Sequence, residues 1–311
     1  MKPVLFNIKK ILIPLDLSIT EKVVPAEAIL LADKTKAEII LITVIEGSTV
    51  NIQEKYFDIS SDEHIKLGDI IVNGVTKQLE KCKAELQKKG ISQVSYLIEK
   101  GKPYKKIIEV AERIRPDIII MGAPEISQTK ELGFGSNTFR VLSNAVCPVL
   151  CTNNEPKEGF KNILLPFRDK PHSRESVDYA TQIAEIYGST IHILGISYDP
   201  SEEGIRKIKL EGEQISHILN ERNVRNTLEV VTGSYVTDLI NDFVKKKEAD
   251  LLVVMADIDK VSISDFIVGP VVQRLINHST IPVLSIHPTI NPNMLEPQHE
   301  AVNAIDWKFW V

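Results

Sequence analysis

Short runs of aliphatic and β-branched residues alternate with longer amphipathic segments along most of the chain. In the first half, the apolar runs cover residues 11–15, 38–45, 94–99, 117–122 and 149–152. Segments with apolar residues at three- and four-residue steps lie between them, at residues 24–35, 65–89, 103–115 and 137–144. The short runs predict strands and the stepped segments predict helices. Strands that are apolar on both faces and separated by helices indicate an open, doubly wound α/β fold with a mainly parallel sheet.

The same pattern occurs twice. Residues 9–18, KKILIPLDLS, align with residues 161–170, KNILLPFRDK, and residues 116–121 align with residues 249–255. The matched single residues are Gly135, Arg140 and Pro148 in the first copy and Gly269, Arg274 and Pro282 in the second. A repeat this long is a duplicated domain and not a solenoid.

The boundary between the copies is expected in a polar, turn-rich segment, residues 152–159. We therefore expect a first domain over residues 1–152, a second over residues 153–288 and a C-terminal tail over residues 289–311. The tail carries Trp307 and Trp310, which we interpret as aromatic anchors of an extended arm docked on the body. A short interaction motif is the alternative.

Composition narrows the class of protein. The 311 residues are 43% hydrophobic and carry 37 Lys+Arg against 42 Asp+Glu, a formal charge of −5. This is typical of a soluble globular protein, and the lack of clustered Lys and Arg argues against nucleic acid as the partner. No apolar stretch reaches the length of a membrane span and no secretory signal is found, so we expect a cytoplasmic protein without a membrane partner. Cys82, Cys147 and Cys151 fit free thiols, with the last two in the core.

Candidate binding residues follow the predicted strands of the first half. Pro14, Leu15 and Asp16 end or follow the first strand, and Met121 and Gly122 end the fourth. The next helix opens with Gly135, Ser136, Asn137 and Thr138. Backbone N–H groups at a helix start, reinforced by the helix dipole, suit a phosphate ligand. The alternative is capping of the helix by its own hydroxyl or amide side chain.

These residues resemble the universal stress protein family in its tandem two-domain form, over residues 7–286. The resemblance is carried by Pro14-x-Asp16, Met121-Gly122, Gly135-Ser136 and Cys147-Pro-Val-Leu. Nucleotide-binding members carry Gly, two residues, Gly, nine residues, then Gly followed by Ser or Thr. Here Gly122 takes the first of these positions and Gly135-Ser136 the last, with a spacer of the family length.

The resemblance implies two flavodoxin-like (adenine nucleotide alpha hydrolase-like) doubly wound parallel-sheet domains that form an intramolecular pseudo-dimer. Their final strands, near Pro148 and Pro282, are expected to meet at the interface. A fused pair would satisfy internally the two-fold contact that single-domain members make between chains. A further homodimer is left open.

The resemblance also implies an adenine nucleotide site in the first half for ATP or AMP with magnesium. It places Asp16 near the adenine or ribose, Val44 beside the adenine, and the glycines and the helix start around the phosphates. The full set of candidate residues is Pro14, Leu15, Asp16, Val44, Met121, Gly122, Glu125, Gly135, Ser136, Asn137 and Thr138. Glu125 departs from the family pattern, because it stands where the middle glycine belongs and brings a negative charge toward the phosphates.

The second half departs further from the nucleotide-binding pattern. Arg168 replaces the acidic residue, Ala256 and Asp259 replace two glycines, and Pro270 follows Gly269 without an N–H to donate. We expect this half to have lost the nucleotide site and to serve structure or pairing, with a different ligand left open.

The resemblance implies a stress-response regulatory or protective module that acts on an unidentified protein partner. A nucleotide-independent interaction or scaffold protein is the alternative, and a weak ATPase, with Glu125 as its water-positioning group, is the less favoured one. No P-loop and no dinucleotide fingerprint occur, and the seven histidines lack the paired spacing of a helical zinc site. No constellation of residues indicates a dedicated catalytic mechanism.

Overall fold

The structure is a computed structural model of the chain. It describes residues 8–17, 24–46, 61–122, 136–152, 159–168, 175–256, 258–262, 265–268, 272, 274–276 and 279–286. For residues 61–68, 136, 175, 258–262 and 265–268 it describes the backbone alone.

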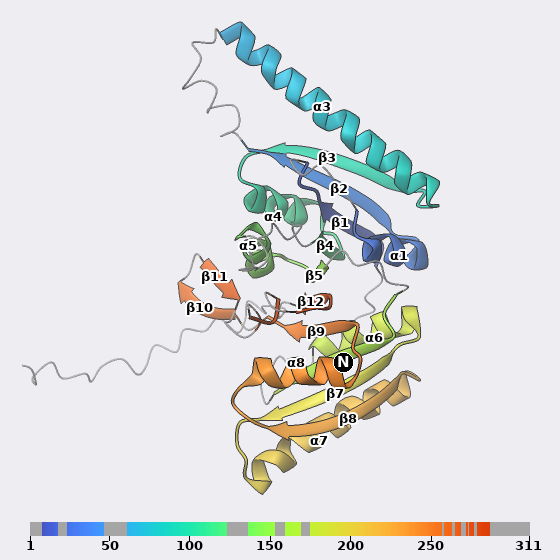
Figure 1. Cartoon of the computed structure of the whole chain (residues 1–311), viewed down its shortest axis with the longest axis vertical. Helices are drawn as coiled ribbons and strands as arrows, with labels where there is room; N and C mark the ends of the chain where they lie inside the picture. Colours follow the sequence, from blue (N-terminus) through green and yellow to red (C-terminus); the bar gives the residue numbers. More distant parts are fainter. Residues whose placement is uncertain are drawn as a thin grey trace, which may run out of the picture.

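The described strands form a ten-stranded sheet and a separate two-stranded hairpin (Figure 1). The order in the large sheet is β3-β2-β1-β4-β5-β12-β9-β6-β7-β8. The strands of the first half are β1 (Lys10–Pro14), β2 (Glu38–Ile45), β3 (Val94–Lys100), β4 (Ile118–Gly122) and β5 (Val149–Thr152). Those of the second half are β6 (Asn162–Phe167), β7 (Thr190–Ser197), β8 (Arg225–Thr232), β9 (Leu251–Met255), β10 (Ile258–Ser262), β11 (Asp265–Val268) and β12 (Val283–Ile286).

Helices cover both faces of the large sheet. They are α1 (Ala26–Thr35), α3 (Ser61–Lys88), α4 (Pro103–Ile114), α5 (Ser136–Asn144), α6 (Glu175–Tyr187), α7 (Glu202–Glu221) and α8 (Val236–Lys246). One buried apolar cluster contains residues of α1, α3, α6 and α7, and a second contains residues of α4, α5 and α8. Each cluster draws on both halves of the chain, so the halves present equivalent faces to the same side. The expectation of two doubly wound α/β domains is confirmed.

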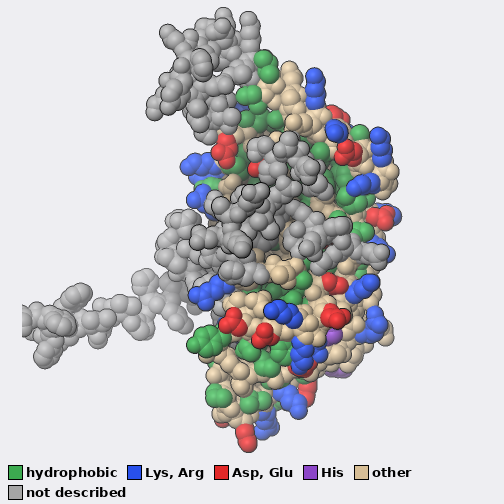
Figure 2. All heavy atoms as spheres, viewed as in Figure 1, with side chains coloured by type: hydrophobic (Ala, Val, Ile, Leu, Met, Phe, Trp, Pro, Cys, Tyr) green, Lys and Arg blue, Asp and Glu red, His purple; other side chains and the backbone are tan. Residues whose placement is uncertain are grey.

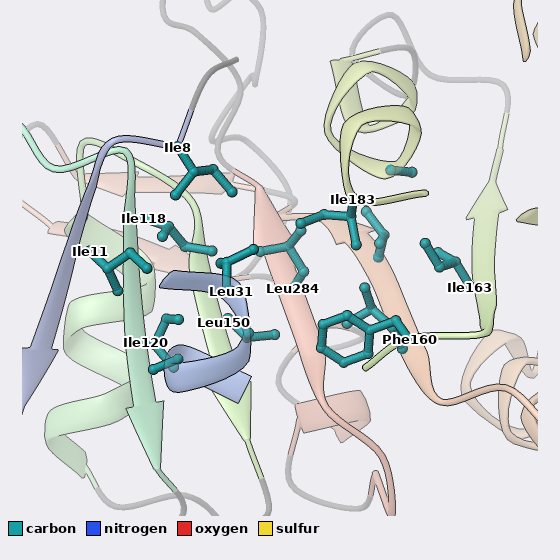
Figure 3. Close-up of a cluster of buried hydrophobic side chains, with 14 of the residues drawn as sticks. Ile8, Ile11, Leu31, Ile118, Ile120, Leu150, Phe160, Ile163, Ile183 and Leu284 are labelled. Carbon is teal, nitrogen blue, oxygen red and sulfur yellow. The ribbon is translucent and has the colours of Figure 1, made fainter. Parts of the chain in front are cut away.

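The two halves meet at the antiparallel pair β5 and β12. Leu150 lies opposite Leu284, and Cys151 lies opposite Val283. Both leucines are almost fully buried, and Leu284 lies between Leu31 of α1 and Ile183 of α6 (Figure 3). The other neighbouring strand pairs of this sheet run parallel. The expected pseudo-dimer, with its last strands at the interface, is therefore a single continuous sheet.

The duplication extends to backbone geometry. Helices α1, α3, α4, α6, α7 and α8 are each followed, within two residues, by a residue with positive φ, and the positions correspond between the halves. The pairs are Lys36 with Gly188, Gly90 with Asn223, and Arg115 with Glu248. The left-handed conformation lets the chain leave a helix and turn back into the next strand. The same three turns thus occur in both halves, whether or not a glycine is present.

An aspartate fixes the start of the central strands in each half. The Asp117 carboxylate accepts hydrogen bonds from the backbone N–H groups of Lys9 and Lys10, both at 2.8 Å. The Asp250 carboxylate accepts the equivalent bonds from Lys161 and Asn162, at 2.8 and 3.0 Å. These bonds connect the segment before β4 to the start of β1, and the segment before β9 to the start of β6. They explain why both repeated segments, residues 116–121 and 249–255, have an aspartate at the second position.

Several sequence expectations differ from the structure in detail. The long amphipathic helix begins at Ser61 and not at residue 65, and the hairpin of β10 and β11 was not expected. The C-terminal tail with its tryptophans lies outside the described residues. No helix within the described ranges is long and apolar enough to cross a membrane. On the face in Figure 2, the described basic and acidic side chains are interspersed without a broad basic patch.

Replacing Asp117 by alanine removes two charge-assisted hydrogen bonds to backbone N–H groups. A hydrogen bond to a charged group contributes roughly 1.5–3 kcal/mol, and the bond from Lys9 is solvent-exposed and contributes less, so we expect a loss of about 2–4 kcal/mol of unfolding free energy. Asp250→Ala should give a similar loss in the second half. Urea denaturation followed by circular dichroism measures both, and Asp33→Ala, a change to a surface ion pair with Lys36, should leave the midpoint unchanged. If Asp117→Ala and Asp250→Ala both had the same denaturation midpoint as the wild type, this role of the aspartates would be contradicted.

Glu248→Gly should stabilise the protein by about 0.5–1 kcal/mol. Glu248 has φ 47°, a backbone conformation that costs an L-residue about 1–2 kcal/mol and that glycine adopts without this cost. Part of the stabilisation is lost again, because glycine has more conformational entropy in the unfolded chain. The control is Glu248→Ala, which keeps the Cβ and should give no gain in the same thermal denaturation. Equal melting temperatures for the glycine and alanine variants would show that backbone strain is not the cause.

The cysteines at the junction of the halves should be unreactive in the native protein. Burial raises the pKa of the Cys147 thiol to about 12 and raises the pKa of the Cys151 thiol further. Since the thiolate is the nucleophile, neither residue should be alkylated by iodoacetamide at pH 8 until the protein is denatured. Peptide mass spectrometry gives the answer, and rapid native modification of Cys151 would contradict its burial at the β5–β12 pair.

Candidate functional site

The strand order reverses between β1 and β4. β1 pairs with β2 on one side and with β4 on the other, and the β1–β4 ladder contains the pairs Ile11 with Ile118 and Leu12 with Ile119. Both strands continue past this ladder, to Pro14 and Gly122. In open α/β sheets, ligands bind beyond the carboxyl ends of the strands at such a reversal. Those sequence-predicted residues of the first half that the structure describes lie at or near this edge.

The end of β1 is fixed to β2. The Leu15 N–H donates to the Ile42 carbonyl at 2.8 Å, and the Thr43 hydroxyl donates to the Leu15 carbonyl at 2.9 Å. Thr43 is buried, so its hydroxyl serves the backbone and not the solvent. These bonds hold Pro14 half-buried and leave Asp16 exposed at the edge of the sheet.

Val44 follows Thr43 on β2 and is half-buried. It packs against the apolar cluster on the α4 and α5 face of the sheet. Successive residues of a strand point to opposite faces of the sheet. The Thr43 side chain therefore hydrogen-bonds the backbone at the end of β1, and the Val44 side chain packs on the opposite face. The result is an apolar side chain close to the carboxyl end of β2, where the sequence places the adenine.

The end of β4 and the start of α5 complete the edge. Met121 is buried in the same apolar cluster, and Gly122 lies in register with Thr152 of β5. α5 leads from this edge back to β5, which is parallel to β4, so its N-terminus lies at the carboxyl ends of the strands. Thr138 is buried and Asn137 is half-buried in the first turn of α5. Ser136 begins that helix, whereas Glu125 and Gly135 lie outside the described residues.

Arg140 is a charged residue at this edge that the sequence singled out only as part of a repeated motif. Its guanidinium carbon lies 4.6 Å from the ring centroid of Tyr104, in the first turn of α4. Such an arrangement is a cation–π contact, and it orients a cation on the exposed surface of α5. Arg140 stands four residues after Ser136, a spacing that places both on one face of a helix. This four-residue spacing is the feature of the sequence from which Arg140 could have been predicted to lie near the candidate site.

The same edge of the second half is built differently. Arg168 follows β6, and its Nη1 donates to the Tyr198 hydroxyl at 2.5 Å, with the guanidinium 5.6 Å from the ring centroid. After β9, Ala256 is buried and its N–H donates to the Ile286 carbonyl at 2.8 Å. Asp259 lies in β10, and Pro270 lies outside the described residues. Arg168 and Ala256 of the second half thus make contacts within that half.

His192 has a structural role. His192 of β7 lies with Nδ1 2.9 Å from the Thr227 hydroxyl and Nε2 3.3 Å from the Asn162 carbonyl oxygen of the side chain. Partial burial lowers its pKa, which favours the neutral ring. It sits near the amino ends of β6, β7 and β8, away from the candidate edge. Within the described ranges, no group of three or more His, Cys, Asp or Glu side chains could hold a metal ion.

Comparison with known proteins agrees with this architecture. The sequence model of the universal stress protein family matches residues 7–153 and again residues 159–287. Two proteins of Methanocaldococcus jannaschii, universal stress proteins MJ0531 and MJ0577, are each 28% identical over 151 residues. These matches cover 48% and 46% of this chain, and 85% and 93% of the relatives.

Solved structures show the same two-domain fold at low sequence identity. A universal stress protein from Archaeoglobus fulgidus superimposes with a TM-score of 0.70 at 18% identity, covering 91% of this chain and 97% of its own. A universal stress protein from Pseudomonas aeruginosa superimposes with a TM-score of 0.68 at 18% identity, covering 91% of this chain and 94% of its own. With the family model matching both halves, this chain belongs to the universal stress protein family and carries the family's domain twice.

Proposed function

We propose that the first half binds an adenine nucleotide, ATP or AMP, and that the chain is a stress-response module whose surface responds to that ligand. The observation that carries the proposal is the convergence of the β1, β2 and β4 carboxyl ends with the start of α5 at the strand-order reversal. Ligands of open α/β sheets bind at this position.

The described residues offer suitable chemistry for each part of a nucleotide. Val44 presents apolar surface for the base, and Asp16 is an exposed acceptor for a ribose hydroxyl or the base. The first turn of α5 offers backbone N–H groups, with the amide of Asn137, for the phosphates. Arg140 adds a positive charge on the same helix. Magnesium would be held mainly by the phosphates and water, as is usual for this ion.

The second half does not share this arrangement. Arg168 is held on Tyr198. The register corrects the sequence alignment, because Met255, and not Ala256, takes the position of Gly122: Met255 pairs with Ile286 as Gly122 pairs with Thr152. We therefore propose one nucleotide site per chain, in the domain over residues 1–152, with the domain over residues 153–288 serving the shared sheet. A protein partner would then recognise a surface that depends on the ligand in the first half.

A nucleotide-independent scaffold is the second candidate function. The continuous sheet through β5 and β12 favours it, because that sheet joins the two halves through backbone pairing that involves no ligand. A weak ATPase is less favoured, since it depends on Glu125, which is outside the described residues.

Asp16→Ala should weaken binding of ATP by about tenfold, the effect of losing one hydrogen bond to a charged group. Gly135→Glu, which puts a side chain and a negative charge at the helix start, should abolish binding. Isothermal titration calorimetry with ATP and magnesium measures both. The heat-denatured supernatant of freshly purified protein, separated on a nucleotide-resolving column, identifies the ligand that copurifies.

The control for this experiment is Arg168→Ala at the corresponding position of the second half, which should bind ATP like the wild type. A wild-type chain that binds no adenine nucleotide at millimolar concentration and releases none on denaturation would overturn the proposal in favour of the scaffold.

A further inference from the structure

Within the described ranges, the hairpin of β10 and β11 is an element of the second half without a described counterpart in the first. Its strands pair antiparallel, with Ile258 opposite Val268 and Asp259 opposite Ile267. It lies between β9 and the helical segment around residues 272–276. In the first half, the corresponding segment is residues 123–135, which connects β4 to α5. The second half therefore has a hairpin at the chain position of the candidate phosphate loop.

The sequence of this segment explains its structure. Residues 258–268 read IDKVSISDFIV, which is rich in β-branched residues and contains no glycine. Residues 122–135 of the first half contain three glycines and one proline. Isoleucine, valine and phenylalanine favour extended strands, whereas glycine allows backbone to approach a phosphate. The second-half segment is thus suited to pairing and unsuited to cradling a phosphate.

The hairpin lies against the other half of the molecule. Strand β11 contacts α5, and the two elements are neighbours in Figure 1. α5 also contacts α4 of its own half. The helix that begins with the candidate phosphate donors is therefore packed between an element of the first half and an element of the second.

α5 needs such neighbours. It has nine residues, and an isolated helix this short is unstable in water. Val141 and Leu142 are fully buried and anchor one side of it, so its position is set by packing against its surroundings.

We propose that the β10–β11 hairpin braces α5, so that the second half controls the ligand site of the first half. The brace holds the first turn of α5 at the carboxyl edge of β1 and β4, in position to receive phosphates. By linkage, a ligand bound there stabilises the contact between α5 and the hairpin to the same extent that the hairpin improves binding. The ligand part of this inference rests on the proposed function, whereas the brace itself does not.

The decisive experiment is hydrogen exchange on the full chain after residues 258–268 are replaced by a short Gly-Ser linker. Amides of α5 should exchange at least tenfold faster than in the wild type, and amides of α1 and α7 should be unchanged. In calorimetry, ATP with magnesium should bind about tenfold more weakly. Unchanged exchange of α5 would overturn the brace.

A second, milder variant keeps the proposal testable if the protein with the Gly-Ser linker does not fold. Ile267→Pro removes a strand N–H and should disrupt the ladder between β10 and β11 while leaving the large sheet intact. Tyr235→Ser, at a highly exposed position of the second half that is not part of the hairpin, is the matched control and should change neither α5 exchange nor binding.

The outcomes separate the two proposals. Faster α5 exchange in both hairpin variants, in a protein that binds no nucleotide, supports the brace and overturns the proposed function. Nucleotide binding by the wild type that is unaltered in both variants, together with unchanged α5 exchange, overturns the brace and leaves the proposed function in place.

Discussion

The pairing of β5 with β12 is the interaction on which the rest of the molecule depends. Every residue of these two strands is buried, which is unsuitable for an edge strand exposed to water. An unpaired apolar edge would also recruit other chains through its free N–H and C=O groups. Each half pairs with the last strand of the other half, so either domain alone would expose an unpaired apolar edge strand. The chain is therefore one structural unit, although its sequence is a duplication.

The antiparallel direction of this pair determines how the halves are arranged. It relates them by an approximate two-fold axis, so that equivalent helices α1 and α6 lie on the same face of the sheet. The twist of the long sheet then brings the carboxyl ends of the outer strands β3 and β8 to the same side of the molecule (Figure 1). Strand β11, which comes after β9 in the chain, consequently contacts α5, which comes after β4. The contact between α5 and the hairpin is a product of this geometry.

Much of this could be predicted from the sequence because its signals are local. Apolar runs such as residues 38–45 and 149–152 coincide with β2 and β5, and Pro103 marks the start of α4. The duplicated aspartates, Asp117 and Asp250, were visible as a repeat, but their hydrogen bonds to β1 and β6 join residues far apart in the chain and needed the structure. The hairpin was missed because residues 258–268 were interpreted by alignment with the first-half loop and not by their own β-branched pattern. The contact between Arg140 and Tyr104 could not be predicted, because the two residues belong to different helices and lie far apart in the chain.

The shared sheet also explains why the halves can differ at their ligand edges. Folding needs the buried faces of both halves and the β5–β12 pair, and neither Asp16 nor Arg168 belongs to the apolar clusters on those faces. Arg168 can therefore contact Tyr198 without cost to the sheet, and the corresponding residue of the first half is the exposed Asp16. At the position of the second half that corresponds to residues 123–135, residues 258–268 pair as β10 and β11. Duplication thus lets the two halves differ at this edge while they share one sheet.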